Sequence, residues 1–154
     1  MVLSLQILQI ETPVDTGSFS MQTENAVADL FQAVVAQAPD AMIYADRDGA
    51  IRIWNQAAEA LFGYSAAQVM GGSLDVIIPE RFRAAHWAGF TKAVESGQPR
   101  LGGRVLTTRS VHKDGSRLYV DLSFGLVKDA GGNVVGVLAI GRDVTEQRSK
   151  TESR

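Results

Sequence analysis

The stretch "APDAMIYADRDGAIRIWNQAAEALFGY", residues 38–64, decides the fold. It contains two short apolar runs typical of strands, and a turn that ends in Gly49 separates them. Because glycine adopts positive φ at little cost, this pattern predicts a β-hairpin. Asn55 then stands at the N-cap of a predicted helix over residues 56–62, and Gly63 occupies the position where a left-handed C-cap is usual.

The residues that follow predict short helices, one longer helix and three more strands. The helical segments are residues 65–69, 73–77 and 80–96, and the strands are residues 102–112, 117–127 and 134–144. The second of these strands alternates cleanly, with one face formed by Leu118, Val120, Leu122, Phe124 and Leu126. This order indicates an α+β domain with an antiparallel sheet covered on one face by helices.

The composition narrows the classes of function. A chain of 154 residues with 45% hydrophobic side chains is large enough for one hydrophobic core. The chain has fifteen Lys plus Arg and seventeen Asp plus Glu, so its net charge is close to zero. It therefore lacks the excess of positive charge that is typical of proteins that bind nucleic acid. The absence of cysteine removes disulfides, thiolate metal sites and covalent thiol photochemistry.

The N-terminal region divides at Ser20, where the composition changes. Residues 1–20 are expected to form an arm, and their apolar run lacks the basic flank of a signal peptide and the length of a membrane span. A cytoplasmic location without membrane contact is therefore expected. Residues 21–38 predict an amphipathic helix whose apolar side exceeds what one sheet edge needs, so a homodimer is expected.

Taken together, these motifs resemble the PAS family of sensor domains. The resemblance covers residues 30–147 and rests on Asn55, on "LFGY" at residues 61–64 and on "RDVTE" at residues 142–146. It implies a PAS domain over residues 39–147, followed by a tail of residues 148–154. It also implies a five-stranded sheet in spatial order 2-1-5-4-3, with helices enclosing a ligand pocket. The implied role is sensory signalling through a dimer, an output domain or a partner protein, and no enzyme motif was found.

His86 is the residue that most invites a functional interpretation. It shares the apolar face of the longer helix with residues spaced four apart, namely Phe82, Phe90 and Val94, and small residues lie beside it. An inward imidazole needs a partner, and a haem iron is a suitable one. The segment "PERFRAAH" is similar to the proximal-histidine helix of oxygen-sensing haem PAS domains of the FixL kind. That similarity implies haem b with His86 as its axial ligand and Phe90 as a neighbouring contact.

The same resemblance implies a distal side for the haem. Arg104, in "LGGRV", matches the arginine near the start of the third strand that lies beside the gas ligand in those domains. Leu122 and Phe124 match positions of the apolar distal wall, although Phe124 is bulkier than the aliphatic residue usual there. A charged donor at this place would favour oxygen over less polar gases.

A second interpretation remains open. A PAS module without haem would bind a small metabolite, or act only in dimerisation and protein interaction, and His86 would then be a packed helix residue. Photosensing of the LOV type, which requires a pocket cysteine, is excluded, whereas a noncovalent flavin is not. His112 is expected to be a solvated surface residue, and Trp87 an exposed interface contact or a pocket lid.

Overall fold

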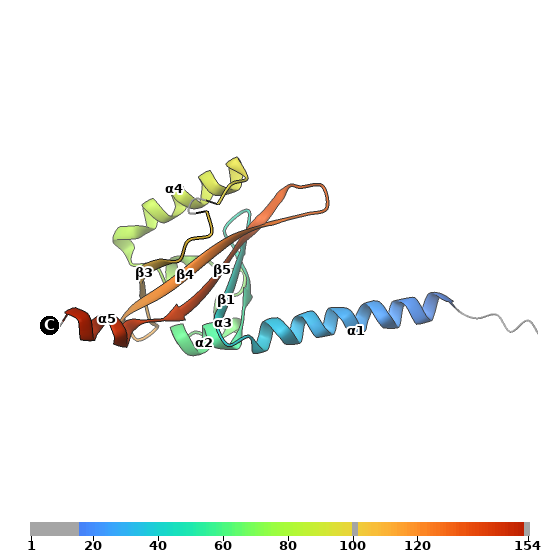
Figure 1. Ribbon diagram of the computed structural model, residues 1–154, viewed down its shortest axis with the longest axis horizontal. Coiled ribbons are helices and arrows are strands. Elements are labelled where there is room, and N and C mark those ends of the chain that lie inside the picture. The colour runs from blue at the N-terminus through green and yellow to red at the C-terminus, as the bar shows by residue number, and fades with distance from the viewer. Residues whose placement is uncertain (1–15, 100–101, 153–154) are drawn as a thin grey trace, which may run out of the picture. The chain divides into compact units, whose positions relative to one another are not determined.

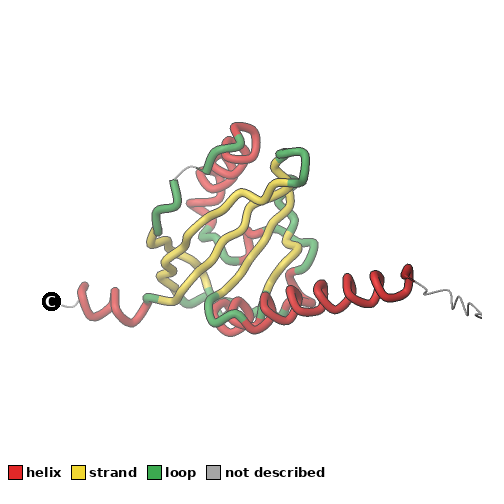
Figure 2. Tube along the Cα trace, turned by 45° about the vertical axis from the view of Figure 1, so that its right-hand side comes forward, coloured by secondary structure: helices red, strands yellow, loops and turns green. Residues whose placement is uncertain are grey.

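The computed structural model describes residues 16–99 and 102–152 of the chain. Its elements are α1 (Thr16–Gln37), β1 (Ala41–Asp46), β2 (Ile51–Trp54), α2 (Gln56–Phe62), α3 (Ala66–Val69), η1 (Leu74–Val76), α4 (Glu80–Ser96), β3 (Leu106–Val111), β4 (Arg117–Lys128), β5 (Val134–Asp143) and α5 (Thr145–Glu152). The strands form an antiparallel sheet in the order β2-β1-β5-β4-β3 (Figures 1 and 2). The predicted α+β class and strand order are therefore confirmed.

The β1–β2 hairpin and α2 form as the local sequence predicts. Gly49 closes the turn with a φ of 82°, in the left-handed region. Gly63 ends α2 with a φ of 80°, and its N–H bonds to the Glu59 carbonyl. Both positions suit glycine because other residues are strained in this conformation.

The Asn55 side chain joins the start of the domain to its first strand. Its carbonyl oxygen accepts hydrogen bonds from the Ala58 N–H at 3.0 Å and the Met42 N–H at 2.9 Å. Its amide group donates to the Val35 carbonyl at 3.0 Å and the Asp40 carbonyl at 3.1 Å. The side chain is buried, with 4% of the residue exposed. The predicted N-cap is confirmed, and it also fixes the chain that enters β1.

Two clusters of apolar side chains form the core on one face of the sheet. The larger one packs β1, β2 and β4 against α2, α3 and η1, and its buried members are Ala41, Ile43, Ile51, Trp54, Ala58, Phe62, Val69, Ile77, Leu118 and Val120. The smaller one holds α4 to the sheet, and its buried members are Ala45, Phe90, Val94 and Val134. The predicted inner face of β4 is confirmed, because Leu122 packs against the first cluster and Leu126 against the second.

Helix α1 is longer than the sequence indicated, since it begins at Thr16 rather than at residue 21. The boundary between two compact units of the chain falls within it, after Ala33. Exposed apolar residues occur along it, namely Met21, Val27, Leu30, Phe31 and Val34. Residues 1–15 of the expected arm lie outside the described residues. In the described part of the chain, no helix combines the length and apolar character that crossing a membrane requires.

The third strand begins later than predicted. Gly102 and Gly103 have φ values of 53° and 81°, and both belong to a turn in which the Gly102 N–H bonds to the Pro99 carbonyl. The ladder with β4 starts at Leu106, so Arg104 precedes the strand instead of lying within it. At the other end of the chain, α5 extends to Glu152 and includes most of the expected tail.

Replacing Asn55 by Ala is expected to lower the free energy of unfolding by about 2–4 kcal/mol. The substitution removes a helix cap and leaves the Met42 N–H and the carbonyls of Val35 and Asp40 without this partner. Denaturant unfolding measures the change. Asn133→Ala is the matched control, because among the described residues the Asn133 side chain bonds only to Asp129, within an exposed turn. Equal costs for the two variants would contradict the assigned role of Asn55.

Candidate functional site

Helix α4 places His86 between a buried helix end and an exposed one. Phe90 and Val94 are buried against the sheet, whereas Phe82, one turn before His86, is 39% exposed. The His86 ring is half-buried and lies 4.8 Å from the Trp87 ring and 6.3 Å from the Phe90 ring, measured between centroids. Its Nδ1 atom is buried and has no hydrogen-bond partner in the described part of the chain. A buried polar atom of this kind calls for a partner.

Burial lowers the pKa of His86 below its ordinary value, because the charged imidazolium loses solvation. The nearby Asp75 carboxylate opposes this shift by favouring the charged form, but it is the smaller influence. His86 is therefore neutral at neutral pH. Neutral imidazole is the form that binds metal ions.

Trp87 connects α4 to η1 and to the β1–β2 turn. Its indole N–H donates to the Asp75 carboxylate at 2.8 Å, and its ring packs on Phe90 at 5.3 Å between centroids. The ring also covers Gly49, where an added Cβ would lie 2.6 Å from Trp87 Cζ3. The expectation of an exposed interface contact at Trp87 is wrong, because the side chain is half-buried against the β1–β2 turn.

The apolar row of β4 continues at Phe124, between the residues that pack in the two core clusters. Phe124 is half-buried and belongs to neither of the two core clusters formed by the described residues. Its partner on β5 is Ala139, a small residue, and Leu106 on the edge strand is 43% exposed. Leu122 is also half-buried. The apolar surface between the two clusters is therefore a candidate wall for a flat ligand.

Arg104 is exposed and makes no ion pair within the described residues. The ladder pairs Leu106 with Leu122 and Thr107 with Asp121. Extending this register by two residues would pair Arg104 with Phe124, on the same face of the sheet as Leu122. Because the ladder starts at Leu106, the structure does not pair Arg104 with Phe124, and their position on one side of the site stays a prediction.

His112 differs from its expected place on the solvated surface. The residue is half-buried, its Nδ1 accepts a hydrogen bond from the Asp114 N–H at 3.2 Å, and its ring packs against Gly63. An added Cβ at Gly63 would lie 2.6 Å from the His112 ring. His112 therefore supports the junction between α2 and the β3–β4 turn, away from the candidate site.

The donors at the candidate site fit a haem. His86 offers a neutral imidazole with an unpartnered buried nitrogen, and the half-buried apolar residues of the sheet suit a flat apolar macrocycle. Small residues lie beside His86 along α4, so a flat ligand can approach the helix closely. They are Ala85, Gly89 and Ala93. One imidazole is enough protein ligation for haem, because the cofactor itself holds its iron.

Comparison with known families agrees with this fold. A family model described as PAS fold matches residues 29–144. The chain belongs to the PAS family. Its domain is 28% identical over 129 residues to the oxygen sensor protein DosP of Escherichia coli strain K12, and 29% identical over 125 residues to the sensor protein FixL of Bradyrhizobium diazoefficiens. These matches cover 84% and 80% of this chain but only 16% and 24% of the two relatives.

Solved PAS structures support the same fold. A PAS domain from Colwellia psychrerythraea aligns with a TM-score of 0.66 and 25% identity, over 78% of this chain and 98% of that one. An RNA-binding light-oxygen-voltage receptor aligns with a TM-score of 0.65 and 19% identity, over 97% of this chain and 39% of that one. At this identity, the second likeness shows the fold alone.

The pH dependence of stability should reveal the burial of His86. Because its pKa is lowered on folding, the unfolded chain binds the proton more readily, so stability is lost as pH falls from about 6.5 through the folded pKa. His86→Gln is expected to remove this loss, and His112→Gln is the control for loss of a histidine. Denaturant unfolding at several pH values, with NMR titration of the imidazole, provides the measurement. An unchanged slope in His86→Gln would contradict the prediction.

Proposed function

We propose that this PAS domain is a sensory module that binds haem b through His86 and responds to oxygen or another diatomic gas. The observation that carries the proposal is the buried Nδ1 atom of His86, which has no hydrogen-bond partner among the described residues. A buried imidazole in its neutral form is ready to ligate iron without a prior loss of a proton.

Other residues of the site would hold and surround the cofactor. Leu122 and Phe124 would present an apolar wall from β4 and exclude water, while Phe90 would support the His86 ring from the next turn of α4. When bound, haem supplies an iron that takes a diatomic gas as its ligand. Arg104 would contribute a charged donor on the opposite side, favouring oxygen over less polar gases.

The named relatives support a role in oxygen sensing. DosP is described as an oxygen sensor protein and FixL as a sensor protein, and both are several times longer than the matched region. The chain spans about a sixth and a quarter of their lengths. We therefore infer that the domain passes its signal to an output domain or partner protein rather than catalysing a reaction itself.

The alternative is a PAS module that binds a small metabolite or acts only through dimerisation. In that case His86 would be a packed residue of α4, and its unpartnered nitrogen would meet a donor or acceptor of a different ligand. Flavin is one such ligand, because solved structures with this fold include light-oxygen-voltage domains. The absorption spectrum distinguishes these cases.

Wild-type protein expressed with ample haem is expected to show a Soret band, and His86→Ala is expected to lose it. His112→Ala is the matched control and should retain the band, because His112 packs against Gly63 away from the site. Absorption spectroscopy of the purified variants, repeated after reconstitution with haem, provides the measurement. A wild-type protein that stays colourless and takes up no haem would exclude haem binding and leave the metabolite alternative.

A homodimer formed through α1 is expected from the exposed apolar residues of that helix. Leu30 and Phe31 are 61% and 67% exposed, and covering such side chains is favourable. Leu30→Glu should shift the protein toward monomer in sedimentation velocity, whereas Gln32→Glu adds the same charge at an exposed polar position and should not. A wild-type monomer at high micromolar concentration would contradict the prediction.

A further inference from the structure

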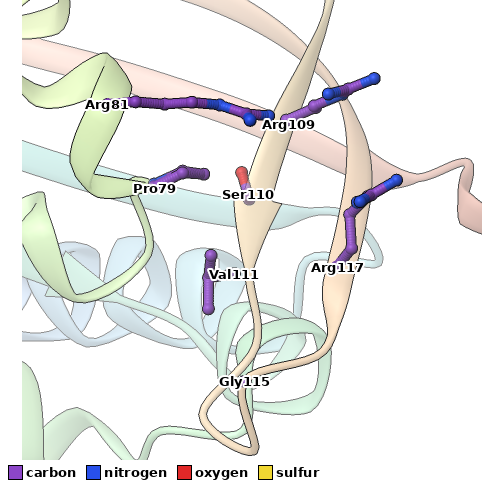
Figure 3. A pocket seen from close by; sticks show the side chains of 7 residues that line it. All are labelled: Pro79, Arg81, Arg109, Ser110, Val111, Gly115 and Arg117. Carbon is purple, nitrogen blue, oxygen red and sulfur yellow. The ribbon is translucent and has the colours of Figure 1, made fainter.

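An open depression of about 400 Å³ lies away from His86, where the start of α4 meets β3 and β4. Its lining residues are Pro79, Arg81, Arg109, Ser110, Val111, Gly115 and Arg117. Figure 3 shows Arg81 reaching from α4 toward Arg109 on β3, with Arg117 projecting from the neighbouring strand. Three arginines thus belong to the lining of this depression.

The three arginines differ from others of the same domain in their pairing. Arg52, Arg83 and Arg142 each lie within 4.0 Å of a carboxylate oxygen. Within the described residues, no ion pair involves Arg81, Arg109 or Arg117. Glu80 precedes Arg81 in the chain and does not pair with it there either. An anion in the depression would supply the negative charge that these three arginines lack within the described residues.

Two of the guanidinium groups are held in place by aromatic rings. The Arg81 group lies 4.7 Å from the centroid of the Phe82 ring, and the Arg109 group lies 5.6 Å from the centroid of the Tyr119 ring. A stacked guanidinium keeps its planar edge of N–H donors available to a ligand. The stacking also reduces the conformational entropy that binding would otherwise remove.

The backbone places Arg109 and Arg117 together and adds a donor. The ladder pairs Arg109 with Tyr119 and Val111 with Arg117, so both arginines lie on one face of the sheet. The Val111 N–H points away from β4 and bonds to the Ile77 carbonyl. By the alternation of an antiparallel ladder, the Arg109 N–H points to the same side of β3, away from β4.

We propose that this depression binds a phosphate group, carried either by a small molecule or by a lipid headgroup. Planar, forked donors match the oxygens of phosphate, and its double negative charge suits three arginines better than a single carboxylate would. The lining contains neither His86, Arg104, Leu122 nor Phe124, so the proposal is independent of haem binding.

Titration with inorganic pyrophosphate tests the proposal on the full chain. Binding is followed by calorimetry and by the amide NMR signals of Ser110 and Val111, which should shift. Arg109→Ala and Arg117→Ala should each weaken binding about tenfold, because each removes a charge-assisted donor. Arg47→Ala, which removes an exposed arginine of the β1–β2 turn outside the depression, should leave it unchanged. Arg109→Lys keeps the charge but loses the planar fork, and should restore only part of the affinity.

Two further arms identify the source of the phosphate. Phosphatidylcholine vesicles with and without phosphatidic acid test a headgroup, and selective binding to the acidic vesicles that depends on Arg109 would support this source. The proposal would be overturned if the protein bound neither pyrophosphate at millimolar concentration nor the vesicles that contain phosphatidic acid. Equal loss of binding in Arg47→Ala would do the same, since it would indicate general charge attraction. A glutamate-rich peptide that binds as tightly as pyrophosphate would replace phosphate with an acidic protein partner.

Discussion

The fold depends first on the buried amide of Asn55. One side chain serves two backbone N–H groups as acceptor and two backbone carbonyls as donor, so its hydrogen-bonding capacity is fully used. These partners belong to the chain before β1, to β1 itself and to α2. An apolar residue of similar size would leave several buried backbone groups without a partner, and water has little access at 4% exposure. Strand β1 lies between β2 and β5, and Asn55 thereby links its position to α2.

The candidate site arises where the core is interrupted. The first cluster packs α2, α3 and η1 against the sheet, and the second packs the later half of α4. Phe124 lies between them and packs in neither within the described residues, while His86 keeps an unpartnered nitrogen. The proposed binding of haem therefore depends on His86 and on the half-buried residues of β4, since the PAS fold alone does not specify a ligand.

Local patterns in the sequence predicted the elements, because their causes are local. The turn at Gly49, the cap at Asn55 and the alternation along β4 each depend on residues that are close together in the chain. The errors at Trp87 and His112, in contrast, concern contacts between distant segments. No local pattern places the Trp87 ring on Gly49 or the His112 ring on Gly63. The three arginines of the depression also come from separate segments, so only the packing of α4 beside the β3–β4 hairpin reveals them.

Helix α4 is held on both sides of His86, and this limits how it can move. Before His86, Arg83 donates to the carbonyls of Ile78 and Asp75 at 3.1 Å. After it, the Trp87 indole bonds to the Asp75 carboxylate, and Phe90 is buried against the sheet. Trp87, the neighbour of His86, thus contacts η1 through Asp75 and the β1–β2 turn through its ring on Gly49. These contacts join the helix that carries His86 to the turn that starts the sheet.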